Sequence, residues 1–137
     1  MIQIVAGQKG EGKTKQLIQN ANEFIKQAKG NVVFIHYHNR PMYTLHYSIR
    51  FITTQEFPIR NSDEFIGFLH GLLSRDRDIE KIYIDEILKI ACIDIDEVAT
   101  IVEQLRIMSK RYHVQFIISL NCLNQDLPQT LKPFLVA

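Results

Sequence analysis

Apolar residues follow two alternating patterns along this chain. Short runs rich in β-branched and aromatic residues, without polar alternation, predict strands at 2–6, 31–37, 48–53, 81–85 and 114–120. Between several of them, apolar residues at helical spacing predict helices over 13–29, 61–74 and 94–111. Nearly continuous apolar strands that alternate with helices are typical of a parallel sheet covered on both faces. The pattern therefore predicts an α/β fold with three α/β/α layers and a mainly parallel five-stranded sheet.

Turn and capping residues mark the expected ends of these elements. Gly30 is placed to cap the C-terminus of the first helix, and Asn61 with Glu64 resembles a capping box that opens the second. Pro128 and Pro133 bracket a short terminal turn or helix. No repeat, low-complexity segment or linker interrupts the series, so we expect one domain over residues 1–137.

Composition narrows the class of protein. The chain has 137 residues, 46% of them hydrophobic and 23% charged, which indicates a folded core. A net charge of +1 does not indicate nucleic-acid binding, and no apolar run approaches the roughly 18 residues of a membrane span. The start of the chain lacks the features of a signal peptide. Cys92 and Cys122 lack metal-ligand spacing, so we expect two buried thiols in a cytoplasmic protein.

One glycine-rich segment carries recognisable chemistry. Residues 7–14 match G-x-x-x-x-G-K-[ST] at every fixed position, between a predicted strand and a predicted helix. In such a loop, backbone N–H groups and the helix N-terminus surround phosphate oxygens. Lys13 would reach the β- and γ-phosphates, and the Thr14 hydroxyl would bind Mg²⁺. The predicted nucleotide-binding residues are Gly7, Gln8, Lys9, Gly10, Glu11, Gly12, Lys13 and Thr14.

A pair of acidic residues follows the fourth predicted strand. Asp85 would lie at the carboxyl edge of the sheet, beside the loop, and hold Mg²⁺ with Thr14. Glu86 would orient or deprotonate a nucleophile, so Lys13 and Glu86 are the candidate catalytic residues. Asn121 ends the last strand, where it is either a sensor of the γ-phosphate or a plain strand-ending turn.

These motifs resemble those of the P-loop nucleoside triphosphatases, in particular the class with a catalytic glutamate after the metal-binding aspartate. The resemblance spans the chain. The order of elements is also similar to the core of type II thymidine kinases, in which Ile84-Asp85-Glu86 and the strand from Phe116 to Asn121 have counterparts. The zinc-binding lasso of those kinases has no equivalent here. The chain further resembles small stand-alone bacterial P-loop proteins that are labelled twitching-motility ATPases.

The resemblance implies a P-loop fold that binds ATP and Mg²⁺ and hydrolyses ATP. No arginine has an obvious position beside the transferring phosphoryl group, so we expect slow turnover whose output is exerted through self-assembly or a protein partner. Two alternatives stay open. The chain could be a kinase for a nucleoside or another small acceptor, or a nucleotide-dependent switch with negligible turnover. No Asn-Lys-x-Asp motif points to GTP.

Several other polar residues have two interpretations each. His36 and His38 alternate at the end of a strand and either share a metal or form a polar strand end. Arg40, Arg50 and Arg60 are either solvated or contact phosphate, nucleic acid or a neighbour. The aromatic segment 36–47 could recognise a base or a partner, or cover the core.

Overall fold

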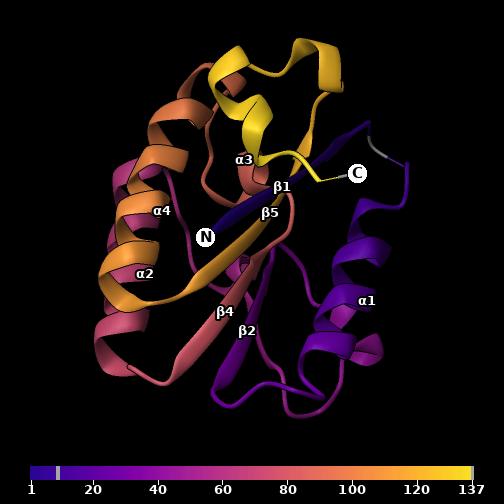
Figure 1. Ribbon diagram of the computed structural model, residues 1–137, viewed down its shortest axis with the longest axis vertical. Coiled ribbons are helices and arrows are strands. Elements are labelled where there is room, and N and C mark those ends of the chain that lie inside the picture. Colours follow the sequence, from indigo (N-terminus) through magenta and orange to yellow (C-terminus); the bar gives the residue numbers. More distant parts are fainter. Residues whose placement is uncertain (9, 137) are drawn as a thin grey trace.

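Five strands form one sheet in which every neighbouring pair runs parallel, in the order β1-β5-β4-β2-β3 (Figure 1). The structure, a computed structural model, describes residues 1–8 and 10–136. The strands are β1 (Ile2–Gly7), β2 (Asn31–His36), β3 (Arg50–Thr53), β4 (Ile79–Ile84) and β5 (Gln115–Asn121). The helices are α1 (Lys13–Phe24), α2 (Ser62–Arg75), α3 (Ile87–Ile90) and α4 (Val98–Tyr112). This arrangement confirms the α/β class and the five-stranded sheet.

Helices cover both faces of the sheet. Helix α1, which connects β1 to β2, lies on one face, whereas α2 and α4, which lead back toward β5, lie together on the other (Figure 1). Right-handed crossovers require this division, because the chain first moves from β1 toward β3 and then returns. The carboxyl ends of all five strands consequently meet at one edge of the sheet.

Side chains of each central strand alternate between two separate cores. Phe34, Tyr83 and Ile117 pack under α1, with the Phe34 and Tyr83 rings stacked at a centroid distance of 5.7 Å. Residues one position away, such as Ile35 and Ile118, pack under α2 and α4 instead. Burial on both faces explains why the strands appear in the sequence as nearly continuous apolar runs.

The C-terminal segment pairs with part of β1, one of the two edge strands of the sheet. Leu135 forms an isolated parallel bridge with Ile4 of β1, and the Val136 N–H donates to the Ile4 carbonyl at 2.9 Å. Figure 1 shows this segment running alongside β1. Pairing removes unsatisfied backbone groups that an edge strand would otherwise present.

The prediction of one continuous helix over 13–29 with a Gly30 cap is wrong. Helix α1 ends at Phe24. Gly30 instead lies against the turn that precedes β4, where a Cβ atom would be 2.2 Å from the Asp78 carbonyl oxygen. Its N–H donates to the Glu80 carboxylate at 2.9 Å. Glycine is thus required at position 30 because the backbone at Asp78 approaches it closely, and not because it caps a helix.

Other boundaries also differ from the predictions. The fourth strand begins at Ile79, two residues earlier than expected, and the helix expected from residue 94 begins at Val98 after a 3₁₀ turn, Ile95–Glu97. Helix α3 was not predicted, because four residues are too few to show a helical period.

Two predictions from the sequence concern the burial of the cysteines and the presence of membrane-spanning segments. Cys92 is exposed and Cys122 is half-buried, so the expectation of two buried thiols is wrong. Cys92 lies just after α3, at a left-handed position with φ of 56°. Within residues 1–8 and 10–136, no helix combines the length and the apolar character needed to cross a bilayer.

Replacing Gly30 with alanine tests the close approach to Asp78. We expect Gly30→Ala to lower the free energy of unfolding by about 1–3 kcal/mol, because the added methyl group overpacks against a backbone carbonyl. Urea denaturation measures this change. Gly67→Ala, in the open on α2, is the control and should raise stability by up to ~1 kcal/mol. Equal effects of the two substitutions would refute the steric explanation.

Candidate functional site

A row of polar side chains crosses the three central strands at their carboxyl ends. In register, Phe34, Tyr83 and Ile117 lie side by side on β2, β4 and β5. Two residues further along, on the same face, are His36, Asp85 and Ser119. The Asp85 N–H donates to the Ile35 carbonyl at 3.0 Å, which keeps Asp85 beside β2 although β4 itself ends at Ile84. The polar row therefore lies beneath the first turn of α1.

Asp85 is fully buried and accepts three side-chain hydrogen bonds. Its Oδ2 accepts from Thr14 Oγ1 at 2.7 Å and from His36 Nε2 at 3.0 Å. Its Oδ1 accepts from Ser119 Oγ at 2.6 Å. Burial acts to raise the pKa of this carboxyl, but the bonds from His36, Ser119 and Thr14 outweigh it and place the pKa below its ordinary value. Asp85 is consequently ionised at neutral pH.

The position of the proton on His36 follows from its neighbours. The backbone N–H of His38 donates to His36 Nδ1 at 3.0 Å, so Nδ1 carries a lone pair. The ring proton is then on Nε2, which faces Asp85. With a side chain only 2% exposed, His36 is enclosed between β2 and the carboxylate.

The loop before α1 depends on left-handed glycines and on contacts within itself. Gly10 and Gly12 have φ of 90° and 81°, values that disfavour any side chain, and Gly12 opens α1. Lys13 Nζ donates to the Gln8 carbonyl at 2.6 Å, and the Gln8 N–H donates to the Glu11 carboxylate. The buried Lys13 ammonium is thus paired with a neutral carbonyl.

Glu86 has a strained backbone at the start of α3. Its φ and ψ of 59° and 60° are left-handed, a conformation that costs a residue with a side chain on the order of 1–3 kcal/mol. The Glu86 N–H donates to Ser119 Oγ at 2.7 Å, and its carbonyl accepts from Lys89 and Ile90. One hydroxyl, that of Ser119, therefore holds both the Asp85 carboxylate and the backbone of Glu86.

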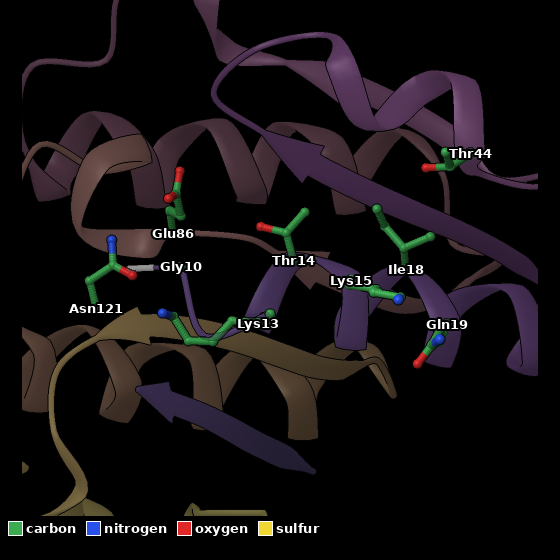
Figure 2. A pocket seen from close by; sticks show the side chains of 10 residues that line it. Gly10, Lys13, Thr14, Lys15, Ile18, Gln19, Thr44, Glu86 and Asn121 are labelled. Atoms are coloured by element: carbon green, nitrogen blue, oxygen red, sulfur yellow. The ribbon is translucent and has the colours of Figure 1, made fainter. Parts of the chain in front are cut away.

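A cavity of about 690 Å³ opens between the loop, α1 and the strand ends. Figure 2 shows Lys13, Glu86 and Asn121 at one end of it and Ile18, Gln19 and Thr44 at the other. Lys13 and Glu86 are charged groups at the first end, and the Lys15 side chain lies beside Ile18 and Gln19. Lining residues that the sequence did not indicate are Lys15, Ile18 and Gln19, whereas Thr44 belongs to the aromatic segment 36–47.

The cavity brings together most, but not all, of the predicted site residues. Those that line it are Gly10, Gly12, Lys13, Thr14, Glu86 and Asn121. Gly7, Gln8 and Glu11 do not line this cavity, and Asp85 lies behind Thr14. Lys9 lies outside the described residues. The sequence motifs thus converge on one edge of the sheet, although they are 71 positions apart between Thr14 and Asp85.

The histidines and arginines that the sequence singled out do not line the cavity. The His36 and His38 rings lie 4.2 Å apart, but no group of three or more His, Cys, Asp or Glu residues suited to a metal occurs within the described ranges. Arg50 pairs with Asp76, and Arg60 pairs with Glu64 at 2.8 Å. In the part of the chain that the structure describes, no arginine lines the cavity.

The aromatic segment is held on α1 by one side chain. Asn22 donates to the Thr44 carbonyl at 3.0 Å and accepts from the His46 N–H at 2.8 Å. Tyr43 and Tyr47 are 79% and 92% exposed, so this segment does not simply cover the core. The two bonds fix Thr44 at the end of the cavity opposite Glu86 and Asn121.

No protein-family model matches this chain, and no curated protein matches it at a significant level.

The three bonds to Asp85 predict a pH-dependent contribution to stability. A carboxyl whose pKa is lowered by folding stabilises the protein above its unfolded pKa, about 4, and this contribution is lost as pH falls further. The wild type should therefore exceed Asp85→Asn in free energy of unfolding at pH 6, by a margin that shrinks toward pH 3. Urea titrations in EDTA measure the margin. Asp96→Asn, at an exposed carboxyl, should show a small margin that changes little. A margin for Asp85→Asn that stays constant with pH would contradict the prediction.

Proposed function

We propose that this chain is a P-loop nucleotide-binding protein that takes ATP with Mg²⁺ and hydrolyses it slowly. One observation carries the proposal. The Thr14 hydroxyl, on the first turn of a helix opened by left-handed Gly12, donates to the buried, ionised Asp85 at the wall of a cavity. Beside them, Lys13 and Glu86 line the same cavity.

The shape and charge of the cavity support a nucleoside triphosphate as ligand. Its volume of about 690 Å³ is within the usual range for small-molecule sites. The N-terminus of α1 and Lys13 lie at one end, where helix N–H groups and an ammonium suit phosphate. Ile18, Gln19 and Thr44, at the other end, would contact the sugar and base.

The donor set fits a magnesium ion. Thr14 gives its one hydroxyl proton to Asp85, so the lone pairs of its oxygen are left for a cation. Mg²⁺ prefers oxygen ligands and is commonly held by one or two carboxylates together with substrate phosphates. When bound, it supplies positive charge that neutralises phosphate oxygens. Thr14 and Asp85 would hold it, the latter directly or through water.

Lys13, Glu86 and Asn121 would each have a separate role in the reaction. Lys13 would exchange the Gln8 carbonyl for a phosphate oxygen, and Glu86 would orient a water molecule or take its proton. Asn121 would contact the terminal phosphate from the end of β5. An arginine at the transferring group is worth about 10³–10⁵ in rate, and none lines the cavity within the described residues. Slow turnover, raised by self-assembly or by a protein partner, follows from this arrangement.

Removing the Lys13 charge tests nucleotide binding. Lys13→Ala should weaken binding of a fluorescent ATP analogue roughly 10- to 100-fold, the equivalent of about 1.5–3 kcal/mol for a hydrogen bond to a charged group. Lys26→Ala, on an exposed lysine paired with Glu23 just after α1, should bind within twofold of the wild type. Equal affinity of the Lys13 variant and the wild type would refute the phosphate contact.

Replacing Glu86 with glutamine separates turnover from binding. Glu86→Gln keeps the shape of the side chain but removes the base, so phosphate release should fall by about 10²–10⁴ while affinity for ATP changes less than twofold. Release of radiolabelled phosphate in Mg²⁺ measures this. Unchanged release would remove Glu86 from the chemistry. Label that appears on an added nucleoside, and not as free phosphate, would identify a kinase instead.

A further inference from the structure

His36 contacts Asp85 directly but belongs to neither of the two sequence motifs that define the proposed site. We propose that His36 is a positioning residue that fixes the Asp85 carboxylate for a divalent cation. The inference rests on the proposed function, because it concerns how the same site holds its metal. It adds a residue of β2 to a site otherwise built from α1, β4 and β5.

The hydrogen bonds of Asp85 leave few orientations for its carboxylate. Oδ2 accepts from Thr14 at 2.7 Å and from His36 at 3.0 Å, so both of its lone pairs are used. Oδ1 accepts from Ser119 at 2.6 Å and keeps one acceptor position. Three donors from three elements thus determine which direction of the carboxylate remains open to a cation or to its water.

The His36 ring is itself held in place. Nδ1 accepts the His38 N–H at 3.0 Å, which leaves the proton on Nε2 toward Asp85. A flipped ring would place a carbon against the carboxylate and leave the His38 N–H without its acceptor. Because the ring is 2% exposed, water has little access to replace either bond.

Another histidine shows that the backbone contact alone is an ordinary local feature. His46 Nδ1 accepts the N–H two residues later, from Ser48, at 3.0 Å, as His36 does from His38. Of these two residues, His36 alone contacts a carboxylate through its ring within the described ranges. His46 therefore provides a matched control.

Loss of the His36 ring should weaken the affinity for the metal more than the affinity for the nucleotide. Partners that orient a metal ligand from behind are typically worth about 10- to 100-fold in metal affinity. Lys13, which would face phosphate, donates to the Gln8 carbonyl and not to His36 or Asp85. Glutamine in place of His36 can carry an N–H to nearly the same position as Nε2, whereas leucine fills the space without a donor.

The experiment measures metal and nucleotide affinity separately. Mn²⁺ is titrated by electron paramagnetic resonance into protein saturated with a non-hydrolysable ATP analogue, and the analogue alone is titrated in EDTA. His36→Leu should weaken Mn²⁺ about 10- to 100-fold and change metal-free analogue binding less than twofold. His36→Gln should recover Mn²⁺ affinity to within about threefold of the wild type. His46→Gln should match the wild type in both titrations.

Each other outcome is decisive. Mn²⁺ affinity of His36→Leu within twofold of the wild type would overturn the proposal while leaving ATP binding intact. Parallel loss of Mn²⁺ and metal-free binding without rescue by glutamine would overturn it too, since His36 would then only support the fold. A wild type that binds no analogue would overturn both this proposal and the proposed function. Nitrogen NMR of the wild type should show the His36 proton on Nε2, and a proton on Nδ1 alone would contradict the geometry.

Discussion

The buried carboxylate of Asp85 is the constraint on which the arrangement of the site depends. A charge removed from water is tolerated only when donors replace its hydration, and removing one partner of a buried ion typically costs about 3–5 kcal/mol. The donors to Asp85 come from α1, β2 and β5, that is, from Thr14, His36 and Ser119. The first turn of α1 must therefore lie over these strands in one register. The same bonds that dock the helix also bring the Gly12–Thr14 turn to the carboxyl edge of the sheet, where the metal is proposed to bind.

Ser119 connects this stabilising network to a strained position in the cavity wall, Glu86. Its hydroxyl donates to Asp85 and accepts from the backbone of Glu86, whose φ is 59°. A left-handed residue turns the chain sharply out of β4, which directs the Glu86 side chain to the cavity instead of along the sheet. Backbone strain at such a position persists only when neighbours hold it. The proposed metal ligand and the proposed base are thus supported by one hydroxyl group.

The sequence predicts the parts of this site that are local, and it misses those that depend on strand order. The loop, Asp85 and Glu86 each follow from short patterns of residues beside a strand. His36 and Ser119 could be recognised as partners of Asp85 only once β2, β4 and β5 were known to be neighbours, and no periodicity gives that order. Gly30 was misinterpreted for the same reason, since its contact with Asp78 joins segments distant in the chain.

The charges around the cavity would make binding of the proposed metal and binding of the proposed nucleotide depend on each other. Lys13 and Lys15 line it with two positive charges, and Glu86 together with Asp85 behind Thr14 supplies two negative charges. Among the described residues these charges cancel, and the charges of a bound triphosphate would lie near both carboxylates. A divalent cation held by Asp85 and Thr14 would supply positive charge that relieves this repulsion, and phosphate oxygens are ligands that such a cation prefers. Cation and triphosphate should thus each strengthen the binding of the other, a reciprocity that thermodynamic linkage requires.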